Sequence, residues 1–83
     1  MKEVKVYSKS HCPYCVKAKQ LLKSKNIPFQ EIDLTNDSAT QGKLVQETGW
    51  QTVPMIFIGG KLIGGFDNLN ALNQKGELDA LLA

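Results

Sequence analysis

The chain of 83 residues contains no arginine, only two cysteines and one histidine, and no long apolar run. A transmembrane helix needs about 20 consecutive apolar residues, and no segment approaches that length. The N-terminal residues, MKEVK, also lack the uninterrupted apolar stretch of a signal peptide. We therefore expect a soluble, cytoplasmic protein in a reducing compartment, with no membrane partner.

The positive charge is carried by lysine alone and is unevenly distributed. The formal net charge is +2, and the first 25 residues hold seven of the ten lysines but only one acid, Glu3. The absence of arginine argues against a nucleic-acid-binding patch. We expect the lysines between Lys17 and Lys25 to lie on a solvated helix face, and we predict a local positive potential near the two cysteines.

The length and the residue patterns predict one α/β domain spanning residues 1–83. Its hydrophobic content of 42% is enough for a globular core without a metal or several disulfides. Alternating and apolar segments predict four strands, at residues 4–7, 29–34, 55–58 and 61–64. Helical spacing and capping residues predict helices that begin at Pro13, at Asn36–Ser38 and at Asp67, with a short closing helix around Leu78.

The predicted order βαβαββα implies a four-stranded mixed sheet flanked by helices. A strand–helix–strand connection is right-handed and makes its two strands parallel. The Gly59-Gly60 pair predicts a tight hairpin between the last two strands. The apolar Met55–Ile58 strand is expected to be central in the sheet.

The two cysteines form a single motif, Cys12-Pro13-Tyr14-Cys15, at the junction of the first strand and helix. One helical turn brings thiols at this spacing within disulfide reach, so the motif is typical of a redox pair. A structural disulfide is the weaker alternative, because so short a loop removes little entropy from the unfolded chain. A zinc site needs about four ligands, and only His11 adjoins the cysteines, so we expect no bound metal.

The two thiols are expected to differ in reactivity. Unpaired backbone N–H groups and the helix dipole favour an anion at a helix N-terminus, which predicts that Cys12 is a nucleophilic thiolate. Cys15 lies one turn further along the helix and is expected to be more covered. We predict that Cys12 attacks a disulfide sulfur and that Cys15 resolves the mixed disulfide that forms.

Other segments each allow a functional and an ordinary structural interpretation. Lys9 is either an anchor for a substrate carboxylate or a solvated lysine. Pro54 either marks the start of a strand or follows a cis bond that leaves backbone groups free to pair with an extended peptide. The segment Gly64–Asn68 is either a turn with Asp67 as a helix cap or a place where a helix N-terminus holds a substrate carboxylate.

Together these features resemble the glutaredoxin family, in its dithiol class, and the element order resembles a minimal thioredoxin-like fold. The matching segments occur in the same order over most of the chain: Cys12–Cys15 with Lys9 before it, Thr52-Val53-Pro54, and Gly64-Gly65-Phe66-Asp67. Two residues depart from the common pattern of the family. Many members have a second acid or a serine in place of Asn68, and a smaller residue in place of Phe66.

The resemblance implies a binding groove for glutathione. Val53 would pair its backbone with the cysteinyl part, beside a cis Pro54, while Lys9 and Gln41 would hold the glycyl carboxylate. Asp67 and its surrounding backbone would hold the γ-glutamyl end. The full set of implied glutathione contacts comprises Lys9, Tyr14, Gln41, Thr52, Val53, Pro54, Gly65, Phe66, Asp67 and Asn68. Trp50 could either pack near the proline loop or reach a partner protein, and we expect it to pack.

The resemblance further implies a glutathione-dependent disulfide oxidoreductase, monomeric and without a tightly bound cofactor. Its partners would be glutathione and proteins that carry a disulfide or a glutathione mixed disulfide. One alternative is a related redoxin that thioredoxin reductase reduces, without a glutathione groove. Another is an iron–sulfur carrier in which two subunits share a cluster through Cys12, against which Pro13 argues, because cluster-binding relatives usually have a more yielding residue there.

Overall fold

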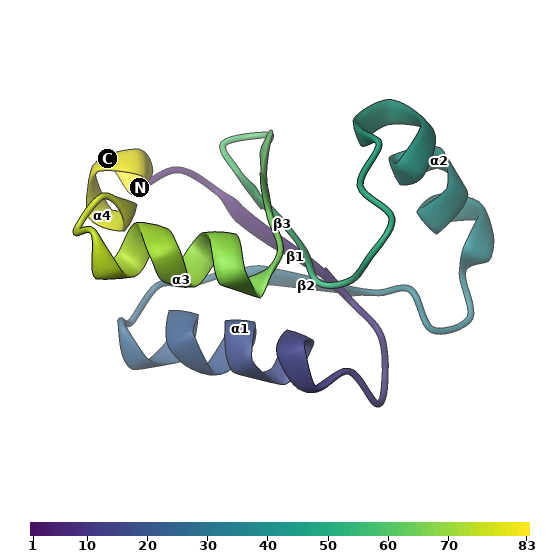
Figure 1. The fold of residues 1–83 in the computed structure, drawn as a ribbon, viewed down its shortest axis with the longest axis horizontal. Helices are drawn as coiled ribbons and strands as arrows, with labels where there is room; N and C mark the ends of the chain where they lie inside the picture. Colours follow the sequence, from purple (N-terminus) through teal and green to yellow (C-terminus); the bar gives the residue numbers. More distant parts are fainter.

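A computed structural model describes residues 1–83 and contains four strands and four helices (Figure 1). In chain order they are β1 (Val4–Ser8), α1 (Pro13–Ser24), β2 (Gln30–Asp33), α2 (Ser38–Thr48), β3 (Met55–Ile58), β4 (Lys61–Gly64), α3 (Phe66–Gln74) and α4 (Leu78–Leu82). The predicted element order, including the short closing helix, is confirmed.

The strands form one mixed sheet in the order β2–β1–β3–β4. β1 runs parallel to β2, with Val6 opposite Glu31, and antiparallel to β3, with Val4 opposite Ile58. β4 is antiparallel to β3, and the Gly59-Gly60 turn joins them with positive φ values of 60° and 80°. β3 therefore lies between two neighbours, as its apolar residues predicted.

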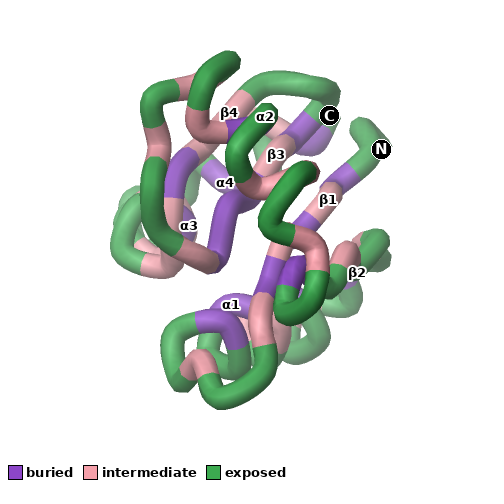
Figure 2. The backbone as a smooth tube through the Cα atoms, turned by 90° about the vertical axis from the view of Figure 1, so that its right-hand side faces the viewer, coloured by how far each residue is buried: buried purple, intermediate pink, exposed green.

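The main core lies between the sheet and the helices α1, α3 and α4. On α1 the buried residues are Cys15, Ala18 and Leu22, which recur at helical spacing and face the sheet. Figure 2 shows buried segments along β1, β3 and the inner side of α1, with exposed segments on the outer turns. The core cluster consists of Val4, Val6, Ala18, Leu22, Ile27, Ile56, Ile58, Leu69, Leu78 and Leu82.

A second, smaller cluster lies beneath α2, which stands apart from α1 and α3 (Figure 1). It is built from Leu34, Leu44 and Met55. The helix begins where the Asp37 side chain accepts the Thr40 N–H at 3.1 Å, and it ends at Gly49. The N-cap lies within the predicted start, Asn36–Ser38, and Gly49, with φ of 76°, has the left-handed conformation common at helix ends.

The start of α3 differs from the prediction. Asp67 was expected to cap this helix, but the N-cap is Gly65, and Asp67 lies exposed in the first turn. Glycine has no side chain to offer, and instead the Asn68 side-chain oxygen accepts the Gly65 N–H at 3.2 Å. Gly64 has φ of 127°, and a Cβ at this position would lie 2.7 Å from Asn68 Cγ, so the chain enters the helix through a turn that only glycine accommodates.

Candidate active site

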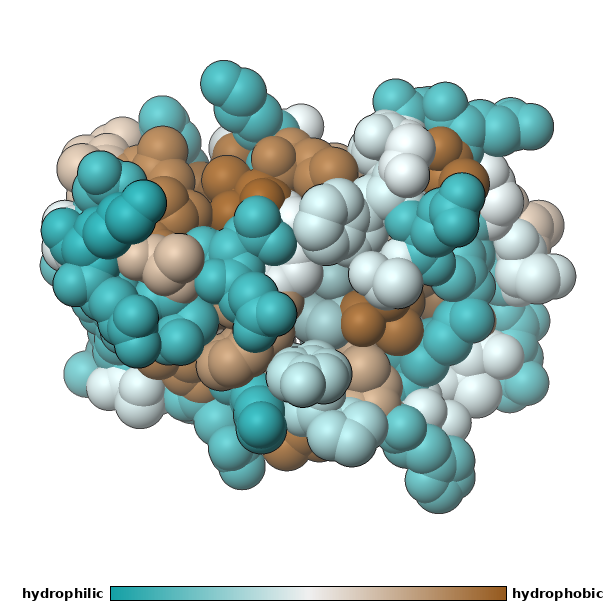
Figure 3. Space-filling model, in the orientation of Figure 1, coloured by the Kyte–Doolittle hydropathy of each residue, from teal (hydrophilic) through white to brown (hydrophobic).

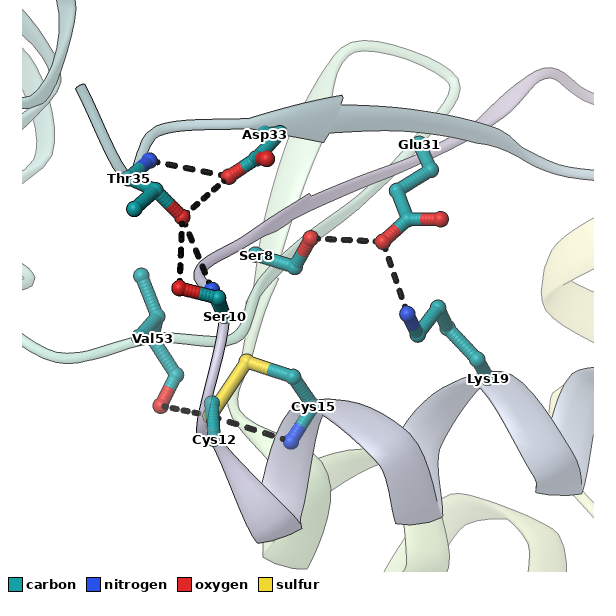
Figure 4. Close-up of a disulfide and its surroundings, with 9 residues drawn as sticks. All are labelled: Ser8, Ser10, Cys12, Cys15, Lys19, Glu31, Asp33, Thr35 and Val53. Atoms are coloured by element: carbon teal, nitrogen blue, oxygen red, sulfur yellow. Dashed lines mark hydrogen bonds and ion pairs between the residues drawn. A yellow bond between two sulfur atoms is a disulfide. The ribbon is translucent and has the colours of Figure 1, made fainter. Parts of the chain in front are cut away.

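Cys12 is the N-cap of α1, and its sulfur lies where the helix presents a free backbone N–H. The Cys15 N–H donates to Cys12 Sγ at 3.2 Å, and Pro13 occupies the first helical position. The two cysteines form a disulfide (Figure 4). In the reduced protein the same N–H would stabilise a Cys12 thiolate, because a hydrogen bond to the charged form favours that form.

The two sulfurs occupy different environments. Cys15 is 1% exposed, whereas Cys12 is only half-buried at the surface end of the helix. The first turn of α1 contains no acidic residue that would oppose an anion there. The geometry therefore allows an incoming disulfide to reach Cys12 and shields Cys15 from it.

The loop before β3 lies directly beside Cys12. The Val53 carbonyl oxygen is 3.8 Å from Cys12 Sγ, and Figure 4 draws both residues at this contact. The Val53–Pro54 peptide bond is cis, the rarer of the two alternatives considered from the sequence. Pro54 is buried, while Val53 is half-buried and borders the groove described next.

A groove of about 370 Å³ opens beside this loop. Eight of the ten residues predicted for glutathione line it, and Trp50 is the ninth lining residue: Tyr14, Trp50, Thr52, Val53, Pro54, Gly65, Phe66, Asp67 and Asn68. Figure 3 shows mainly pale and brown residues between the N-terminal ends of α1 and α3, with teal hydrophilic residues around them. The groove thus brings together three segments that are distant in the sequence.

Lys9 and Gln41 are not among the residues that line the groove. Lys9 is half-buried on the connection between β1 and α1, and Gln41 is half-buried in the first turn of α2. The sequence-based prediction placed both at the glycyl end of glutathione. Their side chains form no hydrogen bond or ion pair within the protein, so both remain available to a ligand.

Trp50 also lines the groove, although it was not among the residues predicted for glutathione and was expected to pack near the proline loop. Its ring lies against the α3 N-cap, since a Cβ on Gly65 would come within 3.4 Å of the Trp50 ring. Its indole Nε1 is buried and has no hydrogen-bond partner. The sequence signal was its position two residues before Thr52, which places it next to the loop that forms one wall.

Tyr14 and Phe66 form an aromatic wall on the side of the groove nearest α1. Their ring centroids are 6.2 Å apart, with an interplanar angle of 32°. Tyr14 is nevertheless 55% exposed. Tyr14 therefore lines the groove, as the resemblance implied, and is also largely exposed at the surface.

The connection that carries Cys12 is tied to the end of β2. The Ser10 N–H donates to the Thr35 side-chain oxygen at 2.8 Å. The Thr35 hydroxyl and backbone N–H both donate to an Asp33 carboxylate oxygen, at 2.5 and 2.9 Å. These two bonds lower the pKa of Asp33. The bridge, drawn in Figure 4, holds the backbone two residues before Cys12 against the sheet.

A second bridge links α1 to β2 on the other side of the cysteines. Glu31 accepts hydrogen bonds from Lys19 Nζ at 2.7 Å and from Ser8 Oγ at 2.8 Å (Figure 4). Ser8 is 2% exposed, so this is how its buried hydroxyl is satisfied. The bond from Lys19, and then that from Ser8, lowers the pKa of Glu31 below its ordinary value of 4.5.

The lowered pKa of Glu31 predicts a stability difference in acid. The Lys19–Glu31 bridge stabilises the fold above pH 4.5, the ordinary pKa, and this contribution is lost as pH falls through the lowered folded value. Glu31→Gln is therefore expected to unfold more easily than the wild type at pH 7, by less than about 1 kcal/mol because the side chain is 41% exposed. Urea denaturation between pH 2 and 7 measures the difference.

The difference in unfolding free energy between the wild type and Glu31→Gln should shrink below pH 4.5 and vanish in stronger acid. Glu47→Gln is the matched control, because Glu47 is exposed on α2 and makes no ion pair. It should track the wild type at every pH. A Glu31→Gln deficit that stays constant from pH 7 to pH 2 would contradict the role given to this carboxylate.

None of the helices has the length and apolar character needed to cross a membrane. No group of three or more histidine, cysteine or acidic side chains is placed to share a metal ion.

Comparison with known proteins places the chain among redox proteins. A family model described as Glutaredoxin matches residues 4–63. Glutaredoxin 3 of Escherichia coli K12 is 45% identical over 82 residues, which cover 99% of each chain. The glutaredoxin of Pseudomonas aeruginosa PAO1 is 45% identical over 83 residues, or 100% of this chain and 99% of that one.

Solved structures agree with this placement. The crystal structure of a buckwheat glutaredoxin–glutathione complex superposes with a TM-score of 0.92 at 38% identity, covering 98% of this chain and 76% of that chain. The crystal structure of wheat glutaredoxin gives a TM-score of 0.90 at 45% identity, covering 95% of this chain and 77% of that chain. The arrangement of sheet and helices is therefore thioredoxin-like, as the element order predicted.

Proposed function

The chain belongs to the glutaredoxin family of glutathione-dependent thiol-disulfide oxidoreductases, and we propose that Cys12 is its nucleophile and Cys15 its resolving thiol. The observation that carries this proposal is the asymmetry of the pair. Cys12 accepts a backbone N–H at 3.2 Å at the helix start and lies 3.8 Å from the carbonyl oxygen of Val53, which lines the groove, while Cys15 is 1% exposed.

The reaction with a glutathione mixed disulfide needs Cys12 alone. The Cys12 thiolate attacks the glutathione sulfur, a new bond joins the two sulfurs, and the substrate leaves as a thiolate that takes a proton from water. The thiolate of a second glutathione then attacks the glutathione held on Cys12. This step releases glutathione disulfide and restores the Cys12 thiolate. In sum, the mixed disulfide and one glutathione become the substrate thiol and glutathione disulfide, so the substrate sulfur is reduced as the sulfur of the second glutathione is oxidised.

The reaction with a protein disulfide uses both cysteines. Cys12 attacks one substrate sulfur and forms a mixed disulfide with the protein, and the other substrate sulfur leaves as a thiol. Cys15 then attacks Cys12, which releases the second substrate thiol and leaves the Cys12–Cys15 disulfide. The structure contains this disulfide, and glutathione is the reductant that reopens it.

We assign the groove to glutathione. The half-buried Val53 backbone, with its carbonyl 3.8 Å from Cys12 Sγ, is suited to pair with the cysteinyl part of the tripeptide. Asp67 and Asn68, in the first turn of α3, are assigned to the γ-glutamyl end. Tyr14, Thr52, Pro54, Gly65 and Phe66 form the remaining predicted walls, while Lys9 and Gln41 are assigned to the glycyl carboxylate.

A comparison of two disulfide caps tests this groove. In a Cys15→Ser variant, Cys12 is capped either with glutathione or with mercaptoethanol, which makes the same disulfide bond without the tripeptide. We expect the glutathione cap to raise the midpoint of thermal unfolding by about 4–8 °C over the other cap, which is about 1 kcal/mol for a domain of this size. Differential scanning calorimetry measures both midpoints.

Asp67→Ala should reduce the difference in thermal midpoint between the glutathione-capped and mercaptoethanol-capped forms, because it removes a side chain assigned to the γ-glutamyl end. Gln74→Ala, at the far end of the same helix, is the control and should leave this difference unchanged. Equal midpoints for the two caps in the Cys15→Ser background would reject the groove as the glutathione site.

We further propose that residues 1–83 act as one domain, as a cytoplasmic monomer without a tightly bound cofactor. The two clusters of apolar residues share the same sheet, which supports a single domain. Proteins that carry a disulfide or a glutathione mixed disulfide are its proposed substrates. Sedimentation of the reduced protein at micromolar concentration measures the oligomeric state.

A further inference from the structure

Most lysines of the first 25 residues either have a carboxylate partner or lie far from Cys12. Ion pairs join Lys5 to Glu3, Lys19 to Glu31 and Lys25 to Asp79, at 3.8, 2.7 and 3.4 Å. Four lysines of this part of the chain form no such pair: Lys2, Lys9, Lys17 and Lys23. Lys2 lies beside the hairpin at Gly59, and Lys23 lies in the last turn of α1. Only Lys9 and Lys17 flank the cysteine motif.

Lys17 is held over the outer wall of the groove. Its Nζ lies 5.1 Å from the centroid of the Tyr14 ring, in cation–π geometry. Tyr14 lines the groove, but Lys17 does not. The ammonium group is exposed and lies one helical turn beyond Tyr14, in a helix whose first turn contains no acid. The one acidic residue that lines the groove is Asp67, which the proposed function assigns to glutathione.

This arrangement leaves one cation for each half of a mixed disulfide. Lys9 is already assigned to the glutathione carboxylate. When glutathione occupies the groove, the protein that carries it would lie outside the groove. Lys17 also lies outside the groove, over the ring of Tyr14, and is an unpaired cation at that edge. A carboxylate on that protein would gain an ion pair and lose little hydration, since both partners remain at the surface.

We propose that Lys17 and the exposed face of Tyr14 form a docking surface for protein substrates that have acidic residues next to their disulfide cysteine. The proposal rests on the proposed function and names its preferred substrate class. The surface is local: it recognises charge within a few residues of the reacting sulfur, and its cation, Lys17, is not among the residues that line the glutathione groove.

Three glutathionylated peptides of equal length test the proposal. They differ only in the two residues on each side of the cysteine, which are glutamate, glutamine or lysine. With reduced glutathione at a fixed saturating concentration and at low salt, we expect kcat/KM for the acidic peptide to exceed that for the neutral one by about 2–5-fold, the range of an exposed ion pair. The lysine peptide should have the lowest kcat/KM. In 0.5 M NaCl the three kcat/KM values should lie closer together, because salt screens exposed charges.

Two variants assign the preference to Lys17. Lys17→Gln should remove it while leaving turnover of the neutral peptide unchanged, and Lys17→Arg should restore it. Lys23→Gln, an exposed lysine on the same helix, should retain the wild-type preference. The docking surface is rejected if the acidic peptide has no advantage, or if its advantage survives in Lys17→Gln. Failure of the neutral peptide to turn over in the wild type would instead reject the proposed function, so the two results are distinguishable.

Discussion

Replacing Cys12 with serine is expected to lower the turnover of a glutathione mixed disulfide by about 1000-fold or more, the scale on which loss of a nucleophile acts. A serine hydroxyl does not ionise near neutral pH and cannot form a disulfide, so the glutathionylated intermediate cannot form. The hydrogen bond from the Cys15 N–H, at 3.2 Å, would then be directed at a group that takes no part in the chemistry. A glutathione-coupled assay with a mixed disulfide substrate measures the loss.

The variant should remain folded, because Cys12 is half-buried at the end of a helix and serine is itself a favourable N-cap residue. Circular dichroism and the thermal midpoint of the reduced proteins provide this control. Full activity in Cys12→Ser would show that another group forms the covalent intermediate, and the assignment of the nucleophile would then be wrong.

Replacing Cys15 with serine is expected to separate the two reactions. Turnover of a glutathione mixed disulfide should be retained, because that route needs only Cys12. Reduction of a protein disulfide should slow by about tenfold or more, since the intramolecular thiol that releases the substrate acts at an effective concentration far above that of free glutathione. Both rates are measured on the same preparation, with a glutathionylated peptide and with a disulfide-bonded protein as substrates.

The ratio of the two rates is the decisive quantity, because a general loss of folding would lower both. Ala18→Ser is a suitable control: it puts a hydroxyl at another buried position of the same helix face and should lower both rates together if it lowers either. Equal losses of both activities in Cys15→Ser would show that Cys15 supports the structure of the site and does not act as a resolving thiol.

The local signals in the sequence were sufficient for most elements. Pro13 occupies the first position of α1, as the sequence predicted, and Asn26, with φ of 57°, follows the C-cap of the helix and precedes the buried Ile27. Met55–Ile58 lies inside the sheet because residues that are apolar on both faces need cover on both. These outcomes follow from residues within one or two turns of each other.

The start of α3 shows where such local reasoning fails. Asp67 has the residue type of a helix cap, but the N-cap of α3 is Gly65, two residues earlier. The reason is a contact between Asn68 and the Gly65 N–H at 3.2 Å, and the close approach of Asn68 to Gly64. Residue type alone does not reveal which of several polar residues reaches back to a free N–H.

The functional site was likewise predictable from the sequence only in part. The Cys-x-x-C spacing at a helix start predicted an accessible thiol and a covered one, and the order of the three groove segments identified the family. Trp50 could not be assigned from the sequence, because its place in the groove depends on the α3 N-cap lying against its ring. The separation of Lys9 and Gln41 from the groove lining likewise depends on how α2 and the loop after β1 are placed.

By itself, the sequence determined the redox chemistry, since two thiols at this spacing on a helix start have few other uses, and it determined the order of strands and helices. Only the tertiary structure decided what surrounds the reacting sulfur. It placed Val53 3.8 Å from Cys12, Phe66 against Tyr14, and Lys17 over the Tyr14 ring with no acid beside it. The physical reason is that covalent spacing and capping act over a few residues, whereas a groove forms where distant segments are brought together by burial of the same core.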